Sequence, residues 1–265
     1  MPHITSADGT VIAYERSGDG PPIVLVDGAC CYRGFGPGPG FVKALAPRFT
    51  VYTYDRRGRG ASTDTPPYAP AREVEDLAAL IEAAGGRAAL LGFSSGAALA
   101  LEAAHRGLPI TGVVAYEPPF IVDRSRPPIP ADFLPRLQAA VDAGRRSEAV
   151  RLFMRLVGAP APFILLMRLM PAWRKLRAVA HTLPYDITIV EPHQHGRPLP
   201  RDRWSGIGCP TLIASGGKSP EWMRAAAAHL ATVVPHAVHR ELPGQTHMVR
   251  PAALVPVAAE FLGVR

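Results

Sequence analysis

Short apolar runs alternate with longer amphipathic stretches over the first part of this chain. Residues 23–26 (Ile-Val-Leu-Val) form a continuous apolar run, which is expected of a strand buried on both faces. Val74, Leu77, Leu80 and Ile81 share one face at helical spacing. The pattern predicts strands over residues 12–14, 23–26, 50–54, 88–92 and 110–116, and helices over residues 41–45, 73–84 and 95–105. Such alternation is typical of an α/β fold with a doubly wound, mostly parallel sheet flanked by helices.

The pattern changes after residue 117 and returns near residue 209. Pro127, Pro128 and Pro130 indicate a linker, and only helical spacing follows it. Helices are predicted over residues 131–143, 146–157, 163–169 and 172–182. The alternation then resumes with strands over 211–215 and 237–242 and helices over 221–233 and 252–261. We therefore expect a core formed by residues 1–117 and 209–265, with residues 118–208 inserted as a helical cap.

Composition and hydropathy predict a chain without a membrane span. The 265 residues are 48% hydrophobic, and the mean hydropathy is +0.08. The longest apolar run, residues 159–167, is far shorter than the roughly 18–20 residues that a membrane span needs. Residues 1–5 lack the pattern of a signal peptide. Three cysteines form no disulfide framework, so we expect a cytoplasmic protein with reduced thiols.

The net charge of +7 is concentrated in one segment. Residues 118–208 contain 14 Lys and Arg against 7 Asp and Glu, whereas the remainder has 15 of each. Two interpretations stay open: a solvated helical surface, or a basic cover that attracts anionic substrates or a carrier protein. No nucleic-acid module accompanies the charge, so the expected partner is a small-molecule substrate, anionic or carrier-bound in the second interpretation. The sequence does not indicate the oligomeric state.

The segment Gly92-Phe93-Ser94-Ser95-Gly96 matches the pattern G-x-S-x-G. It lies between a predicted strand and a predicted helix, which is the context that lifts a serine hydroxyl above a sheet on a sharp turn. The N-terminal end of the helix favours developing negative charge. Ser94 is therefore the candidate nucleophile, and Ser95 is expected to supply a backbone N–H.

His247 is the candidate base because it lies between the last predicted strand and the last predicted helix. The other histidines considered are less well placed; they are His181, His193, His195, His229 and His236. For His193 and His195 we expect a surface position, because no acidic or cysteine spacing supports a metal site. Neither a metal nor a cofactor is expected.

Together these segments resemble the cap-bearing α/β-hydrolase superfamily, which uses nucleophile, acid and histidine in that order along the chain. Gly28-Ala29 resembles the family's oxyanion turn, with Asp27 in place of the usual histidine. The resemblance implies that the backbone N–H groups of Ala29 and Ser95 form an oxyanion hole. Residues 55–60 (Asp-Arg-Arg-Gly-Arg-Gly) resemble a turn of the family that is structural.

The acid departs from the family pattern. Ser219, in Gly216-Gly217-Lys218-Ser219-Pro220, stands where the resemblance implies an aspartate, and a serine cannot stabilise an imidazolium. Family members such as haloalkane dehalogenases keep the acid one strand earlier, and Glu117 occupies that place here. Glu117 is thus the predicted acid. The alternative is a hinge carboxylate that binds backbone and leaves a Ser-His dyad.

These residues predict a serine hydrolase that cleaves a carboxylic ester, lactone or thioester through an acyl-enzyme on Ser94. Dehalogenase and epoxide hydrolase chemistry is disfavoured, because those relatives use a nucleophilic aspartate at this place. The alternative, motivated by Ser219, is a non-hydrolytic member of the fold: a cyclase or lyase that uses His247 as base, or a binding protein.

Two further groups of side chains lie near the predicted site or in the predicted cap. Cys30 and Cys31 follow the oxyanion turn, and packing is the expected role for both. The second group is apolar and would line an acyl pocket or form the cap's own small core; its members are Met154, Phe163, Met167, Met170 and Trp173.

Overall fold

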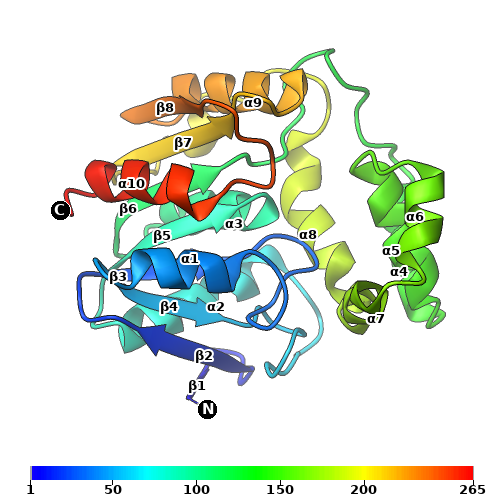
Figure 1. Cartoon of the computed structure of the whole chain (residues 1–265), viewed down its shortest axis with the longest axis horizontal. Coiled ribbons are helices and arrows are strands. Elements are labelled where there is room, and N and C mark those ends of the chain that lie inside the picture. The colour runs from blue at the N-terminus through cyan, green and yellow to red at the C-terminus, as the bar shows by residue number, and fades with distance from the viewer. Residues whose placement is uncertain (1, 265) are drawn as a thin grey trace.

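The structure is a computed structural model that describes residues 2–264, and its centre is an eight-stranded sheet (Figure 1). The strand order is β1-β2-β4-β3-β5-β6-β7-β8; the pairs β1–β2 and β2–β4 are antiparallel and the other pairs are parallel. The predicted mostly parallel sheet is therefore confirmed. The strands are β1 (His3–Thr5), β2 (Val11–Ser17), β3 (Pro22–Val26), β4 (Thr50–Tyr54), β5 (Ala88–Phe93), β6 (Ile110–Tyr116), β7 (Thr211–Gly216) and β8 (Ala237–Leu242).

Helices cover both faces of the sheet. Helices α1 (Gly38–Leu45) and α10 (Pro251–Phe261) lie on one face, and α2 (Pro70–Ala83), α3 (Ser95–His105) and α9 (Glu221–Val233) lie on the other (Figure 1). Successive side chains of a strand point to opposite faces. Accordingly, Val24 packs with the cluster that contains α2 and α3, whereas Leu25 packs with the cluster that contains α1 and α10. Burial on both faces explains the uninterrupted apolar run in β3.

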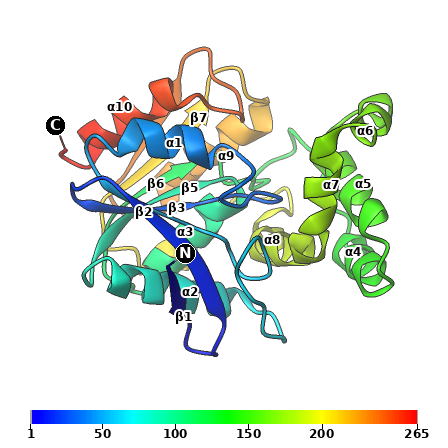
Figure 2. The ribbon, with the colours of Figure 1, turned by 60° about the horizontal axis from the view of Figure 1, so that its bottom comes forward.

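The segment between β6 and β7 contains a separate group of helices beside the carboxyl ends of the parallel strands (Figure 2). These helices pack in a hydrophobic cluster that includes Leu137, Val150 and Leu176 and also Cys30 from the segment after β3. The predicted boundaries of a cap at residues 118 and 208 stay a prediction. The α-helices are α4 (Phe133–Asp142), α5 (Arg146–Leu156), α6 (Ala161–Met167), α7 (Pro171–Ala178) and α8 (Leu183–Val190), and short 3₁₀ turns cover Ala180–Thr182, Glu191–His193 and Asp202–Trp204.

The pattern of hydrophobic positions did not predict β1 or α8. Three residues are too few to show alternation in β1. In α8, Pro184 occupies the first turn, where its missing N–H costs no hydrogen bond. In the sequence, the same proline indicates the end of a helix, so α8 was not predicted. Helix α8 packs against α3, the helix that follows Ser94. Within residues 2–264 no helix has the length and apolar character that crossing a bilayer requires.

Candidate active site

Ser94 lies between β5 and α3 on a turn of unusual backbone geometry. Its φ and ψ are 54° and −124°, a conformation that costs energy for a residue with a Cβ. Its N–H donates to the Tyr116 carbonyl over 2.9 Å. A Cβ on Gly96 would lie 2.1 Å from the Val26 carbonyl oxygen, so only glycine lets the start of α3 approach β3 so closely. The half-buried Ser94 thus occupies a strained strand-to-helix turn.

Glu117 and His247 form a direct contact. The Nδ1 atom of His247 lies 2.7 Å from Oε2 of Glu117, and Oε1 of Glu117 accepts the Gly216 N–H over 2.7 Å. The Glu117 side chain is completely buried, whereas that of His247 is 34% exposed. A carboxylate in this position orients the imidazole with its proton on Nδ1 and stabilises the imidazolium. Both carboxylate oxygens of Glu117 are therefore engaged.

Ser219, at the place where the family resemblance implies an acid, is not part of this contact. Its N–H donates to the Gly216 carbonyl over 2.9 Å in the turn after β7. In the described part of the chain no hydrogen bond joins Ser219 to His247. The carboxylate next to His247 comes instead from the end of β6, the strand that pairs with β7.

Tyr116 links the three loops around these residues, and sequence reasoning did not single it out. Its carbonyl accepts the Ser94 N–H. Its hydroxyl donates to the Thr246 carbonyl over 2.6 Å, immediately before His247. Its place in the sequence, directly before the predicted acid Glu117, is the feature that could have indicated its role. Tyr116 thereby connects the backbone of Ser94, Glu117 and His247.

The turn after β3 packs directly beside Ser94. A Cβ on Gly28 would lie 3.1 Å from the Ser94 Cβ, so this glycine permits the close approach. Within residues 2–264, neither the Ala29 N–H nor the Ser95 N–H donates to a protein acceptor. The Ser95 N–H is one of the unsatisfied donors at the start of α3. In the described structure, each of the two turns that meet at Ser94 therefore carries a backbone N–H without a protein acceptor, which is the kind of donor that an oxyanion hole uses.

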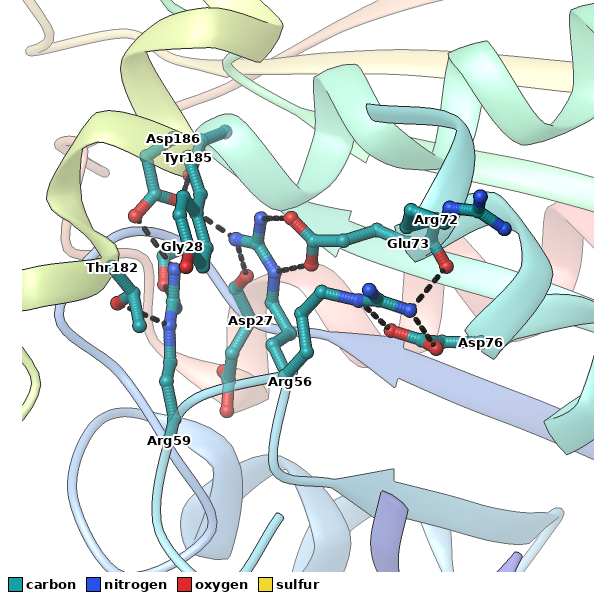
Figure 3. Close-up of polar contacts among 12 residues, drawn as sticks. Asp27, Gly28, Arg56, Arg59, Arg72, Glu73, Asp76, Thr182, Tyr185 and Asp186 are labelled. Atoms are coloured by element: carbon teal, nitrogen blue, oxygen red, sulfur yellow. Dashed lines mark hydrogen bonds and ion pairs between the residues drawn. The ribbon is translucent and has the colours of Figure 1, made fainter. Parts of the chain in front are cut away.

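The buried carboxylate of Asp186, on α8, binds Arg56 and Arg59 (Figure 3). It also accepts a hydrogen bond from Ser95, the residue next to Ser94. Oδ1 of Asp186 accepts from Arg56 Nη1 over 2.7 Å and from Ser95 Oγ over 2.8 Å. Its Oδ2 accepts from Arg59 Nη2 over 2.6 Å. Burial alone would raise the pKa of Asp186, but the charges of Arg59 and Arg56 outweigh it and lower the pKa. Glu73 completes the network with two 2.6 Å contacts to Arg56.

The same two guanidinium groups hold the backbone of the turn after β3. Arg56 Nη1 donates to the Asp27 carbonyl over 3.2 Å. Arg59 Nη1 donates to the carbonyls of Gly28 (2.8 Å) and Cys31 (3.1 Å). The segment 55–60, interpreted from the sequence as a structural turn, therefore supports the residues around Ala29.

Asp27 stands where the family has a histidine. Its carboxyl group is buried, and its hydrogen bonds to water are not fully replaced by bonds to protein. In the described structure its Oδ1 atom has no hydrogen-bond partner. Burial raises the pKa of Asp27 to about 6, although Arg59 and Arg56 partly offset the effect.

The two cysteines beside the turn are poor nucleophiles in this structure. Cys30 is buried and Cys31 is half-buried. Burial raises the pKa of both thiols, that of Cys31 to about 12. A thiol must ionise to react as a nucleophile, so packing is the role that the structure supports for both.

The expected surface position of His193 is wrong. It is 8% exposed, and its ring centre lies 4.6 Å from that of Phe120 and 5.2 Å from that of Trp204. Burial in this aromatic group lowers its pKa to about 4. His195 is more open, 3.8 Å from Glu191. Among residues 2–264 no group of three His, Cys, Asp or Glu side chains could hold a metal ion.

The apolar residues of the inserted segment divide into two sets. Met154, Met167 and Trp173 pack in the cluster that these helices share with the segment after β3. Phe163 and Met170 are about half exposed, so they belong to neither a closed core nor an enclosed pocket.

This chain is similar to known proteins over nearly its whole length. A family model described as "Alpha/beta hydrolase family" matches residues 8–259. The solved structure of an alpha/beta hydrolase from Sphaerobacter thermophilus is 49% identical, with a TM-score of 0.90 over 98% of this chain and 99% of that one. Two more structures are alike in fold: a hydrolase from Pseudomonas aeruginosa (24% identity, TM-score 0.75, 99% and 98% covered) and the enol-lactonase from Burkholderia xenovorans (22%, 0.73, 99% and 100%). No curated protein matches the chain.

Proposed function

Because this chain belongs to the alpha/beta hydrolase family, we propose that it is a serine hydrolase that cleaves a carboxylic ester, lactone or thioester. The observation that carries the proposal is the 2.7 Å contact between Glu117 Oε2 and His247 Nδ1. This contact supplies a carboxylate to the histidine although position 219 is a serine. A hydroxyl on the nucleophile turn becomes a strong nucleophile only when such a pair can accept its proton.

The proposed reaction proceeds in two halves. His247 accepts the proton of Ser94 at Nε2 while Oγ attacks the carbonyl carbon, and Glu117 stabilises the imidazolium. The N–H groups of Ala29 and Ser95 stabilise the oxyanion of the tetrahedral intermediate. When the intermediate collapses, His247 protonates the departing alcohol or thiol. Water then attacks the acyl-enzyme with His247 again as base, and Ser94 is released.

The Asp186 network has a positioning role in this proposal. Oxyanion donors contribute most when they are held in place before the charge develops. Arg56 and Arg59 bind the carbonyls around Ala29, and Asp186 binds both arginines and the Ser95 hydroxyl. The carboxylate of Asp186 is thus connected, directly or through the two arginines, to the segments that carry the Ser95 and Ala29 N–H groups.

The non-hydrolytic alternative depended on the missing acid at position 219. Because Glu117 lies in contact with His247, that reason no longer applies, and no other observation favours a cyclase, a lyase or a binding protein.

A fluorophosphonate probe tests the proposal directly, because it reacts with activated serines. We expect rapid labelling that peptide mass spectrometry locates at Ser94, and no labelling of Ser94→Ala. The matched control, Ser205→Ala, replaces an exposed serine outside the site and should label like the unsubstituted protein. Absence of labelling in a folded protein would refute the acyl-enzyme mechanism.

A further inference from the structure

Exposed apolar side chains are concentrated on α6 and its flanks. Eight large apolar side chains are exposed among residues 2–264, and six of them lie between residues 157 and 170. Leu169 is the extreme case, with 85% of its surface exposed. We define the α6 patch as these six residues together with Arg168: Val157, Phe163, Leu165, Leu166, Arg168, Leu169 and Met170. Clustered exposure of this kind marks a surface that contacts something apolar.

The α6 patch lies outward from a well-packed helix. Ile164 is 3% exposed and packs with the other helices of the inserted segment. Phe163, Leu165 and Leu166 of the same helix are exposed, so they lie on its outward side. Figures 1 and 2 both place α6 at the outer edge of the helical group. Helix α6 therefore packs through Ile164 and presents its other large apolar side chains outward.

The stretch of sequence that contains the patch carries charges of one sign only. Residues 149–185 contain six Lys and Arg and no Asp or Glu. All six are exposed, and in the described structure none forms an ion pair with a carboxylate. They are Arg151, Arg155, Arg168, Arg174, Lys175 and Arg177, on α5, α7 and the turn after α6. Six basic residues of this protein thus lie on α5, α7 and the turn after α6, the elements next to its most apolar surface.

We infer that the α6 patch binds the surface of an anionic lipid membrane. An outward apolar face bordered by Lys and Arg is the arrangement by which helices insert into the boundary between headgroups and acyl chains. Each nearby cation adds attraction to anionic headgroups. A second copy of the chain is a poorer occupant, because it would bring two sets of six cations together.

An acidic protein partner fits the patch less well than lipid. Protein interfaces concentrate their binding energy in Trp, Tyr and Arg, and leucine is under-represented among such residues. The apolar part of the α6 patch contains three leucines, one valine, one methionine and one phenylalanine, with neither Trp nor Tyr. Aliphatic side chains of this kind can insert among the acyl chains just below the lipid headgroups.

Vesicle co-sedimentation tests the inference. At about 0.05 M NaCl we expect the protein to sediment with vesicles of phosphatidylcholine and phosphatidylglycerol, but not with phosphatidylcholine alone. Raising NaCl to about 0.5 M should weaken binding, because salt screens exposed charges. The inference does not rest on the proposed function, so Ser94→Ala should bind as the unsubstituted protein does.

A pair of double variants locates the binding surface. Leu166→Ser with Arg168→Gln should lower vesicle affinity by about tenfold or more, since it removes one inserted side chain and one cation. Val238→Ser with Arg240→Gln is the matched control: an exposed apolar and an exposed basic residue at the same spacing, on β8. It should leave binding unchanged. Unaltered thermal unfolding shows that both double variants are folded.

Four results would overturn the inference. One is absence of sedimentation with either kind of vesicle. Another is an equal loss in the two double variants. A third is a dimer in sedimentation velocity that Leu166→Ser with Arg168→Gln abolishes, which would assign the patch to a second copy. The last is binding of poly-glutamate, without binding of vesicles, that Leu166→Ser with Arg168→Gln weakens, which would assign the patch to an acidic polypeptide.

Discussion

Asp186 accepts a 2.8 Å hydrogen bond from the hydroxyl of Ser95, a residue 91 positions earlier in the chain. Ser95 directly follows the candidate nucleophile, and Asp186 lies on α8 between β6 and β7. The same carboxylate binds Arg56 and Arg59. The segment between β6 and β7 therefore contacts the turn of the candidate nucleophile through a buried charge and not only through apolar packing.

Asp186→Asn should lower kcat by about 10- to 100-fold and change KM little. The asparagine keeps the shape of the side chain but cannot balance two guanidinium charges, so the backbone donors near Ser95 and Ala29 lose their fixed positions. Steady-state kinetics on a water-soluble ester gives both constants. A boronic acid inhibitor, which mimics the tetrahedral intermediate, should lose affinity by the same factor as kcat.

Asp76→Asn is the matched control for Asp186→Asn. Asp76 forms two 2.8 Å contacts with the buried Arg57 but none with the turn after β3 (Figure 3). Loss of one partner of a buried ion pair costs about 3–5 kcal/mol, so both variants should be destabilised. If Asp76→Asn lowers kcat as much as Asp186→Asn, the effect is one of stability and the positioning role is wrong.

Glu117→Gln should reduce kcat by about 10³- to 10⁴-fold. The glutamine oxygen can still accept the Gly216 N–H, but its amide then donates to Nδ1 of His247. This places the histidine proton on Nε2, where the base must accept the proton of Ser94. Ser219→Ala, the companion variant at the position of the usual acid, should keep kcat within a factor of about three. Near-normal turnover by Glu117→Gln would show that the acid lies elsewhere.

Asp27→Asn should stabilise the protein in a pH-dependent way. The pKa of Asp27 is raised from 3.8 to about 6 in the folded state. Between these values the folded state holds more protons than the unfolded state, so this carboxyl lowers stability as pH rises. One pKa unit corresponds to about 1.36 kcal/mol, so its cost above pH 6 is roughly 3 kcal/mol.

Urea unfolding at about pH 4 and about pH 8 measures the effect of Asp27→Asn. The gain should approach roughly 3 kcal/mol at the higher pH and nearly vanish at the lower one. Asp19→Asn, at a carboxylate that is 96% exposed, should give little difference at either pH. A gain for Asp27→Asn that is equal at both pH values would contradict the raised pKa.

Cys31 should react slowly with iodoacetamide in the folded protein. Burial raises its pKa from the ordinary 9.0 to about 12, which leaves about 10³-fold less thiolate near pH 8 than a free thiol has. Mass spectrometry of the alkylated protein should show modification of Cys31 only after unfolding in urea. Modification in the folded protein at the unfolded rate would argue against burial as the controlling factor.

The sequence by itself determined the features that depend on neighbouring residues. Alternating periodicities predicted the mostly parallel sheet, and glycines on both sides of Ser94 predicted the turn after β5 that the structure has. These features are local because strand, turn and helix preferences arise from contacts within a few residues. The position of His247 after β8 followed from the order of the elements.

The family resemblance pointed to Glu117 as the acid, but the tertiary structure decided which carboxylates contact His247 and Ser95. Glu117 and His247 are 130 positions apart, and their contact depends on the pairing of β6, β7 and β8. Asp186 reaches Ser95 because α8 packs against α3. The sequence did not predict α8, because Pro184 in its first turn indicates the end of a helix. A hydropathy pattern shows which face of an element is buried, but not which distant side chain meets it there. Contacts of this kind follow from how the elements dock.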